Sequence, residues 1–234
     1  MWALKKTLDV ISQAAKEGRK NLLETEARAV CLDYGISVAR SELAGNEDEA
    51  VCYAEKIGFP VVLKIVSPDI IHKSDVGGVR VNLRNEEEVH GAYGDILNSV
   101  KEHANKARII GVLVQEMAPP STEVIVGSIK DPQFGATLMF GLGGILVEIL
   151  KDVTFKIAPI TREEAQEMIT EVKAYPILRG YRGTPPSDTN TIIDILLATS
   201  RLVTEYEQIR ELDLNPVIVY EKGAKAVDAR IILE

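Results

Sequence analysis

The sequence of 234 residues predicts an α+β fold built from two lobes. In its first half, segments with a helical spacing of apolar residues alternate with short apolar runs that are typical of strands. Pro119 and Pro120 then interrupt the chain, and the second half both opens and closes with strand-like segments. We therefore expect an N-terminal helix over residues 1–20, a first lobe over residues 21–115 and a second lobe over residues 116–234.

The composition indicates a globular protein. Hydrophobic residues make up 46% of the chain, charged residues 26% and aromatic residues 5%, which excludes a disordered or fibrous class. The formal net charge of −8 argues against a nucleic-acid partner, because such proteins concentrate Lys and Arg on one face. A small anionic ligand remains compatible with this charge, since a few local cations and backbone N–H groups can bind it.

The cysteines and the N-terminus give expectations about the cellular compartment. Cys31 and Cys52 lie in helix-like segments without the spacing of a disulfide framework or zinc site, so we expect two buried small hydrophobes. The first residues lack the apolar core of a signal peptide, and no stretch reaches transmembrane length. We therefore expect a cytoplasmic protein.

The elements of the first half follow from apolar spacing and capping pairs. Leu4, Leu8, Ile11 and Ala15 recur at helical spacing and predict the amphipathic N-terminal helix. Two later helices each begin at a capping pair, an asparagine followed three residues on by a glutamate. The expected helices cover residues 21–33, 46–58 and 85–103, and the expected strands cover residues 36–39, 61–65, 79–83 and 109–114.

The second half is richer in strands. A glycine-rich turn, 141–144, follows the first two strands and leads into the apolar run 145–147. Thr161 and Glu164 form another capping pair, which begins a helix that ends before Pro176, and residues 179–186 form a loop. A longer helix covers residues 190–206, and the expected strands cover residues 123–129, 136–140, 209–214, 217–220 and 226–233, with a turn near Lys222.

Lys64 is the first candidate for binding an anion. It lies late in an apolar strand, where a buried charge needs a partner or an opening to solvent. An anionic ligand would supply the partner, whereas a lysine on an edge strand could instead extend its ammonium group into water. The loop that follows ends in Gly77 and Gly78, and paired glycines let backbone N–H groups approach phosphate closely. An ordinary turn explains the same pair equally well.

His72 lies in that loop and is a candidate nucleophile. An imidazole with an ordinary pKa near 6.5 has a free nitrogen at neutral pH, so it could accept a phosphoryl group, with Asp75 orienting the ring. A polar surface histidine is the alternative interpretation.

The end of the chain offers oxygen ligands for a metal ion. Residues 211–216 alternate polar with apolar, so Glu211, Asp213 and Asn215 share one face of a strand. If the following strand folds back about the turn near Lys222, Asp228 lies opposite Asn215 and Arg230 lies opposite Asp213. Carboxylate and amide oxygens suit Mg²⁺, which shares its shell with water and phosphate. A half-exposed hairpin with a polar outer face is the alternative.

The junction between the lobes carries candidate nucleotide contacts. Backbone groups of Gln115, Glu116 and Met117 could hydrogen-bond an adenine edge, and the Met117 side chain could pack on the ring. Glu123, just beyond, could reach a ribose hydroxyl. A plain linker and an exposed glutamate explain these residues as well.

Together these segments resemble the ATP-grasp fold, and specifically the β subunits of ADP-forming acetyl-CoA synthetases, which are relatives of the succinyl-CoA synthetase β subunit. The resemblance extends along the whole chain. It is carried by FPVVLKIVSPDIIHKSDVGGV, VLVQEM, FGLGGILVEILKDVTFKIAPI and ELDLNPV, in this order and spacing.

This resemblance implies two α+β lobes with a nucleotide in the cleft between them. It also implies an acid–thiol ligase in which acyl-CoA, ADP and phosphate give a carboxylic acid, CoA and ATP. A separate CoA-binding α subunit would form the acyl phosphate and complete an α2β2 heterotetramer, and Mg²⁺ would be the cofactor. By similarity, His72 matches a second phosphohistidine that passes the phosphoryl group from the α side to ADP.

The resemblance also assigns roles to the other candidates. Lys64 would hold nucleotide phosphates, which Gly77 and Gly78 would cradle, and residues 115–117 would meet adenine. The proposed metal ligands are Asn215 and Asp228, with Asp213 as a further one.

Two other functions fit parts of the sequence. An independent ATP-grasp ligase would activate a carboxylate for attack by an amine, but the chain leaves little room for a substrate-binding domain before the first lobe. A nucleotide-sensing module that no longer turns over is the second alternative. The presence of His72, Asn215 and Asp228 argues against such a degenerate site.

Overall fold

The computed structural model describes residues 7–144, 147, 149–183 and 185–234, which form two compact units. The larger unit joins the segment ending at Val38 to residues 120–234, and the smaller unit is Ala39–Pro119. Leu4, Ile145, Leu146 and Thr184, which appear in the expected elements, lie outside the described residues.

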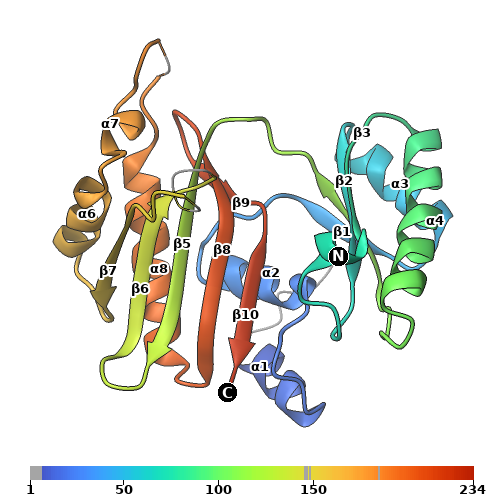
Figure 1. Cartoon of the computed structure of the whole chain (residues 1–234), viewed down its shortest axis with the longest axis horizontal. Coiled ribbons are helices and arrows are strands. Elements are labelled where there is room, and N and C mark those ends of the chain that lie inside the picture. Colours follow the sequence, from blue (N-terminus) through green and yellow to red (C-terminus); the bar gives the residue numbers. More distant parts are fainter. Residues whose placement is uncertain (1–6, 145–146, 148, 184) are drawn as a thin grey trace. The chain divides into compact units, whose positions relative to one another are not determined.

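The larger unit is a six-stranded antiparallel sheet with helices on one face (Figure 1). Its strand order is β10-β8-β5-β6-β7, and β9 pairs with β8. The strands are β5 (Thr122–Asp131), β6 (Gly135–Leu142), β7 (Val153–Ile157), β8 (Ile209–Val219), β9 (Ala224–Ala226) and β10 (Ala229–Leu233). The helices are α1 (Thr7–Lys16), α2 (Glu24–Asp33), α6 (Arg162–Glu171), α7 (Tyr175–Leu178) and α8 (Thr189–Glu205).

Alternation along these strands places the core between sheet and helices. Leu212 and Leu214 of β8 point toward the helices and join Phe140 of β6 and Leu196 of α8 in one buried cluster. The residues between them point to the opposite face of the sheet. This outer face is the one that carries Asp213.

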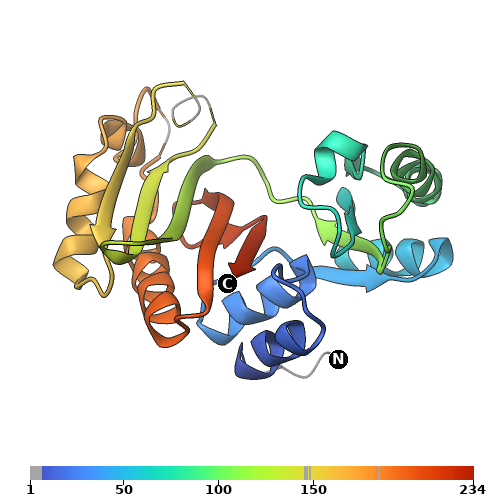
Figure 2. The same ribbon diagram turned by 60° about the horizontal axis from the view of Figure 1, so that its bottom comes forward.

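The N-terminal segment packs in the larger unit, which differs from the expected assignment of residues 21–38 to the first lobe. Ala27, Val30 and Cys31 of α2 belong to the core of the larger unit, and the Leu22 N–H donates to the Ile231 carbonyl of β10 at 3.0 Å. Figure 2 shows α1 and α2 lying side by side near this edge. The apolar face of α2 packs against β10, although the two are far apart in the sequence.

The smaller unit is a four-stranded antiparallel sheet with two helices on one face. Its strand order is β1-β4-β2-β3, with β1 (Ser41–Ala44), β2 (Val61–Val66), β3 (Val79–Leu83) and β4 (Gly111–Glu116). Helices α3 (Glu47–Ile57) and α4 (Glu86–His103) pack on Leu63, Ile65 and Val114. The 3₁₀ helix η1 (Lys73–Val76) lies in the connection between β2 and β3.

The predicted helix starts are confirmed. The side chains of Asn46, Asn85 and Thr161 each accept a hydrogen bond from the backbone N–H three residues later, so each satisfies a donor that the helix leaves unpaired. The N-terminal helix also forms, but its buried face includes Val10 and Ala14 while Leu8 is 58% exposed.

Several strands differ from the sequence prediction. The predicted strand 36–39 is reduced to a single bridge between Val38 and Ala226, and β1 begins later. Strand β8 continues through Pro216 as one element, and β7 was not predicted. The β7 segment is short, and its exposed residues alternate with residues that pack toward α6, so it lacks a continuous apolar run.

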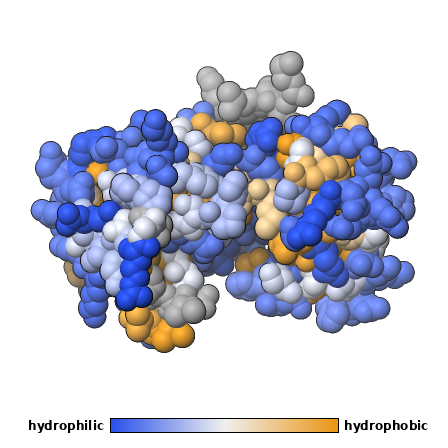
Figure 3. Space-filling model, turned by 90° about the horizontal axis from the view of Figure 1, so that it is seen from above, coloured by the Kyte–Doolittle hydropathy of each residue, from blue (hydrophilic) through white to orange (hydrophobic). Residues whose placement is uncertain are grey.

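The surface properties agree in part with the composition. Figure 3 shows a largely hydrophilic surface, as expected for a chain with 26% charged residues. Cys31 is buried as predicted, and burial raises the pKa of its thiol to about 12, but Cys52 is exposed. Among the described residues, no helix is long and apolar enough to cross a membrane.

Candidate functional site

Lys64 is buried on the face of the smaller sheet that does not pack on α3 and α4. Its side chain is on the same face as Leu113, which it directly opposes on β4, whereas Leu63 and Ile65 enter the core under the helices. Only 6% of Lys64 is exposed, so the edge-strand alternative does not describe it: β2 is an inner strand between β4 and β3. A buried cation at this position requires a partner that balances its charge.

The paired glycines have local structural reasons for being glycine. Gly77 has φ +65° as the C-cap of η1, and a Cβ there would meet Ser99 Oγ at 2.3 Å. A Cβ on Gly78 would lie 2.5 Å from Ile65 Cγ2. Their N–H groups donate within the loop, to the Ser74 and Lys73 carbonyls respectively, so contact with phosphate would require these bonds to open. The glycines therefore shape this loop in the conformation seen here.

His72 is exposed at the start of η1, in a loop that is fixed on either side. Before it, Ile70 is buried in the core, and Asp69 Oδ2 accepts the Arg108 N–H at 2.6 Å. After it, Ser99 Oγ donates to the Val76 carbonyl at 2.9 Å. Among the hydrogen bonds and ion pairs of the described residues, none involves the His72 imidazole, and Asp75 reaches His72 through its backbone N–H only, at 3.3 Å. The loop thus presents an accessible imidazole from a defined position.

The segment 115–117 has its backbone N–H groups engaged. Glu116 N–H donates to the Arg40 carbonyl at 2.9 Å, and Met117 N–H donates to the Pro60 carbonyl at 3.2 Å. The Glu116 carboxylate accepts from Arg40 Nε and from the Arg40 N–H, both at 2.9 Å. Gln115 is fully buried and lies opposite Val62 on the face that carries Lys64. These contacts hold the end of β4 beside Lys64.

The strands that carry the three candidate metal ligands pair in the predicted register. Arg230 opposes Asp213 as predicted, and Ala229 opposes Leu214. The Val227 N–H donates to the Pro216 carbonyl at 2.9 Å. Asn215 and Asp228 lie in the sequence between these pairings, which keeps the predicted register on both sides of them. A bulge in the pairing of β8 with β5 occurs at the same place, between Val124 and Val126, and bulges commonly reorient side chains at sites.

The charges at this hairpin suit a divalent cation. Burial raises the pKa of Asp213, the neighbouring Asp228 and Glu211 raise it further, and Arg230 opposes them. The Arg230 guanidinium lies 3.7 Å from the Asp213 carboxylate. Among the described residues, no group of three or more His, Cys, Asp or Glu side chains is arranged to hold a metal ion. Two carboxylates and one amide make a partial shell, which fits Mg²⁺ because it takes further oxygens from water and phosphate.

A buried ion pair supports the corner from which Asp228 projects, and the sequence analysis did not identify it. Arg28 and Glu24 of α2 are 3.6 Å apart, with side chains 5% and 1% exposed. Arg28 Nη1 also donates to the Val227 carbonyl at 3.3 Å. The signal available in the sequence was an i, i+4 pair of opposite charges on the apolar face of a predicted helix.

Glu123 lies on the rim of a cavity in the larger unit. The cavity has a volume of about 860 Å³ and is lined by residues from five loops and strand ends, including Ser121, Gly143, Ile177, Ser187 and Lys222. The Gly143 N–H donates to the Glu123 carbonyl at 2.7 Å, which brings the glycine-rich turn beside Glu123. The lining combines apolar side chains with hydroxyl and charged groups, as sites for small polar molecules do.

Asp188 fixes one wall of this cavity and was also missed. It caps α8 by accepting the Thr191 N–H at 3.1 Å, and its other oxygen accepts the Gly223 N–H at 2.8 Å. These hydrogen bonds, with the one from Gly223 the largest, lower the pKa of the Asp188 carboxyl. Its position two residues before the predicted helix 190–206, where capping residues are common, was the signal that could have identified it.

Comparison with known proteins places the chain in a family. The model of the ATP-grasp domain matches residues 13–233. The β subunit of ADP-forming acetate–CoA ligase I from Pyrococcus furiosus is 50% identical over 228 residues, which are 97% of this chain and 98% of that protein. The ADP-forming acetate–CoA ligase I of Archaeoglobus fulgidus is 51% identical over 98% of this chain, which spans only 35% of that longer protein.

Solved structures agree with the sequence comparison. Acetyl-coenzyme A synthetase 1 of Candidatus Korarchaeum cryptofilum, in complex with coenzyme A and Ca-AMPCP, matches with a TM-score of 0.95 and 54% identity, over 98% of this chain and 100% of that chain. A complex of the same protein with coenzyme A and Mg-AMPPCP, with its phosphohistidine segment pointing towards the nucleotide binding site, has a TM-score of 0.86 and 51% identity, with the same coverage. The chain therefore belongs to the ATP-grasp family, in the group formed by the β subunits of ADP-forming acetate–CoA ligases.

Proposed function

We propose that this chain is the nucleotide-binding subunit of an ADP-forming acyl-CoA synthetase and transfers a phosphoryl group between a phosphohistidine and ADP. In the net reaction, acyl-CoA, ADP and phosphate give a carboxylic acid, CoA and ATP. The observation that supports this proposal is the register of β8 and β10, in which Asp213 directly opposes Arg230 and Leu214 opposes Ala229, next to Asn215 and Asp228 in the sequence. The P. furiosus and Korarchaeum relatives, named for this reaction, support it.

We assign the phosphate contacts to Lys64. Its buried ammonium group neutralises phosphate charge in a place where water screens little, so the contact is stronger than it would be at the surface. Gly77 and Gly78 set the path of the following loop, and their N–H groups reach phosphate only after their bonds to Ser74 and Lys73 open. The chain of residues 115–117 meets adenine, and Glu123 meets the ribose.

We assign magnesium to Asn215 and Asp228, with Asp213 beside them. The metal, when bound, neutralises charge on the phosphates during transfer. The carboxylates hold it at the sheet, and relief of their mutual repulsion favours its binding. The Mg-AMPPCP complex of the Korarchaeum relative supports this choice of ion.

His72 is the proposed carrier. Its imidazole nitrogen forms an N–P bond as the phosphoryl group leaves the phosphohistidine of the partner subunit, and an oxygen of the ADP β-phosphate then takes the group as that N–P bond breaks. The accessible imidazole fits a residue that must meet a group from another polypeptide. The partner is a CoA-binding α subunit, which the name "subunit beta" of the P. furiosus relative implies for that enzyme.

Reconstitution tests the proposal. The chain is incubated with acetyl-CoA, ADP, phosphate and Mg²⁺, with and without a CoA-binding α subunit from the same organism, and ATP is measured by luciferase. We expect ATP only when both subunits are present. ATP formation, or acyl-CoA synthesis in the reverse direction, by the isolated chain would contradict the subunit assignment and favour an independent ligase.

A further inference from the structure

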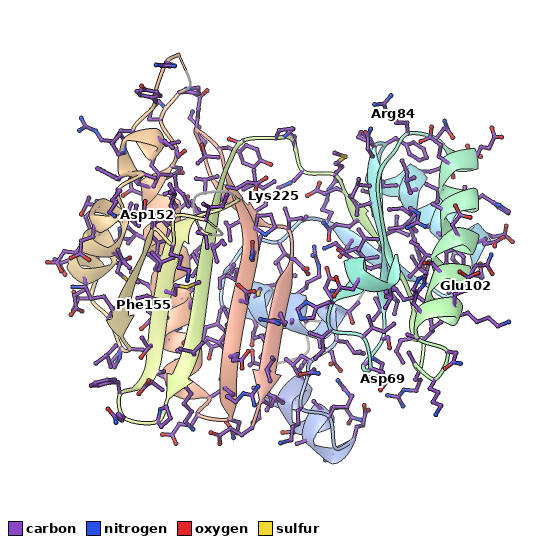
Figure 4. All side chains as sticks on the ribbon, in the orientation of Figure 1. Asp69, Arg84, Glu102, Asp152, Phe155 and Lys225 are labelled. Atoms are coloured by element: carbon purple, nitrogen blue, oxygen red, sulfur yellow. The ribbon has the colours of Figure 1, made fainter. Side chains whose placement is uncertain are left out.

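The outer face of the larger sheet has an apolar half. Four large hydrophobic residues on β5, β7 and the β5–β6 turn, here called the outer apolar patch, are more than half exposed. They are Ile129 (53%), Phe134 (61%), Phe155 (54%) and Ile157 (52%). Phe155 lies on β7 at the edge of the sheet (Figure 4).

Neighbouring contacts fix the direction of the three patch side chains that lie on β5 and β7. Thr154 Oγ1 donates to the Met168 carbonyl of α6 at 3.0 Å, and Lys156 Nζ pairs with Glu167 of the same helix at 2.8 Å. Because successive strand residues alternate, Phe155 and Ile157 point away from the helices. Ile129 joins them on that face, since it directly opposes Thr137, which in turn opposes Ile157.

The patch shares its face with the candidate metal ligands. A row of residues, each directly opposite the next, crosses β10, β8, β5, β6 and β7 and connects the candidate metal ligands to the patch. It runs from Arg230 through Asp213, Gly127 and Met139 to Phe155. Three strand spacings separate Asp213 from Phe155, which corresponds to about 14 Å. A protein that covers the patch therefore has its edge near Asp213, one of the candidate metal ligands.

We propose that the outer apolar patch is the docking surface for the CoA-binding α subunit, an inference that rests on the proposed function. The longer A. fulgidus relative carries about two-thirds of its length outside the region matched by this chain. The P. furiosus relative that this chain matches over 98% of its length is named as a subunit, so on the proposed function the corresponding part is a separate polypeptide. Recruitment needs a surface with an apolar centre, and the patch supplies one.

The size of the patch fits this partner. Its four half-exposed side chains offer on the order of 400 Å² of apolar surface, near the largest patches found on monomers, which are often functional. A stable interface buries about 800 Å² on each partner, so the patch would form its apolar centre and polar neighbours its rim.

The position of the patch favours the α subunit over a second copy of this chain. A two-fold dimer uses the same surface on both partners. Docking of two copies through this face would therefore bring their candidate metal ligands close together and restrict access to both. The α subunit, by contrast, must deliver a phosphoryl group to this face. Docking on the apolar half would place the α subunit about 14 Å from Asp213 and leave the candidate metal ligands accessible.

A double variant, Phe155→Thr with Ile157→Thr, tests the proposal. Threonine keeps a β-branched side chain in the strand but removes most of the apolar area. We expect the dissociation constant for the α subunit, measured by calorimetry, to rise at least tenfold, with affinity for Mg-ADP and melting temperature nearly unchanged. The matched control is Val81→Thr, which removes an exposed side chain from β3 of the smaller unit, where 61% of the valine is exposed. It should leave the affinity for the α subunit unchanged.

A second variant guards against misfolding of β7. Phe134→Ser changes only the β5–β6 turn and should weaken α binding by severalfold. Unchanged affinity for the α subunit in both variants would overturn the proposal. The proposal would also be overturned if the variants bound the α subunit unchanged but no longer self-associated, because the patch would then bind a second copy of this chain. If the wild-type chain binds no α subunit at all, the proposed function fails, which is distinct from failure of the variants to weaken an existing complex.

Discussion

The candidate phosphate side and the candidate metal side of this protein hold their functional residues differently. In the larger unit, Asp213 and its neighbours lie on paired strands, and the corner before β10 rests on a buried ion pair. In the smaller unit, Lys64 is equally fixed on an inner strand, but His72 is exposed on the loop that follows. In both units the residues proposed to bind charge are rigidly placed on strands, whereas the proposed carrier is exposed on a loop that a second polypeptide can reach.

This contrast follows from what each role requires. Neutralising phosphate charge depends on groups placed in advance, because reorganisation during the reaction would cost free energy. A carrier must instead be accessible to both its donor and its acceptor. Variants on the two sides should therefore fail in different ways, and the following experiments separate them.

The largest expected effect is on the carrier. His72→Asn should lower ATP formation by the reconstituted enzyme about a thousandfold or more, because asparagine has no nucleophilic nitrogen. Affinity for Mg-ADP should stay within about twofold, since no described side-chain contact of His72 is lost. Coupled assays and calorimetry measure the two quantities.

His90→Asn is the matched control for this variant. His90 is an exposed histidine of the same unit that pairs with Glu47, so its loss should leave activity unchanged. Full activity of His72→Asn would remove the relay from the mechanism while leaving the nucleotide site intact.

The next effect tests the support of the metal side. Arg28→Met leaves the buried Glu24 carboxylate without the Arg28 charge and should lower the free energy of unfolding by about 3–5 kcal/mol. It also removes the hydrogen bond to the Val227 carbonyl, so the Mn²⁺ dissociation constant, measured by electron paramagnetic resonance, should rise as well.

Adding Glu24→Gln to this variant should restore part of the stability, because the uncompensated charge is then gone. It should not restore metal affinity, because the contact with residue 227 is still missing. Recovery of both quantities together would mean that Arg28 acts on stability alone and does not position Asp228.

Lys64→Met tests the phosphate side. Methionine keeps much of the buried aliphatic volume but removes the charge, so ADP affinity should fall about a hundredfold. The control Lys101→Met, on the exposed surface of α4, should bind ADP as the wild type does. Equal affinities in the two variants would show that Lys64 does not contact phosphate.

The sequence predicted the local structure around the candidate metal ligands, and the helix starts, because their signals were local. The pairing of Asp213 with Arg230 follows from strand alternation and the position of a single turn. The capping residue Asn46 and Glu49, three residues later, predict the start of a helix from four residues. Packing between distant segments left no such signal. Nothing local indicates that α2 packs on β10, and this is why residues 21–38 were expected in the other lobe.

The paired glycines show another limit of sequence interpretation. A GG pair is compatible with a phosphate cradle and with a tight loop, and the two differ only in where the N–H groups point. In the structure both N–H groups donate within the loop, to Ser74 and Lys73. Side-chain crowding, with Ile65 against Gly78, gives a reason for glycine that the sequence could not show.

Gly78→Ala tests that structural reason. The added methyl group would lie 2.5 Å from Ile65 Cγ2 and 2.9 Å from the Lys73 carbonyl, so the variant should lose about 1–3 kcal/mol of unfolding free energy. Gly91→Ala is the matched control. It lies in α4 with nothing within 4 Å of the new methyl group and should gain roughly 0.5–1 kcal/mol, because alanine favours helices. Urea unfolding of both variants measures the difference, and equal stabilities would refute the crowding.

The smallest expected effect concerns the charge of the metal side without its metal. Burial, with help from Asp228 and Glu211, raises the pKa of Asp213 above its ordinary value of 3.8. As pH rises from below 3.8, the unfolded chain loses this proton before the folded chain does, so ionisation of Asp213 favours unfolding. The contribution of this carboxyl to stability therefore decreases as pH rises through its folded pKa, and it stays low at neutral pH.

Asp213→Asn removes this ionisation. Without Mg²⁺ at pH 7, the variant should melt up to a few degrees higher than the wild type, and the difference should vanish below pH 3.8. Loss of the ion pair with Arg230, which lowers the pKa of Asp213 and so opposes the effect of burial, offsets part of this gain. With Mg²⁺ and ADP the order should reverse, because the wild type gains binding free energy that the variant lacks. If the variant melts at a lower temperature than the wild type without Mg²⁺, the ion pair of Asp213 with Arg230 stabilises the fold. The charge of Asp213 would then have a structural role and not a role in binding a cation.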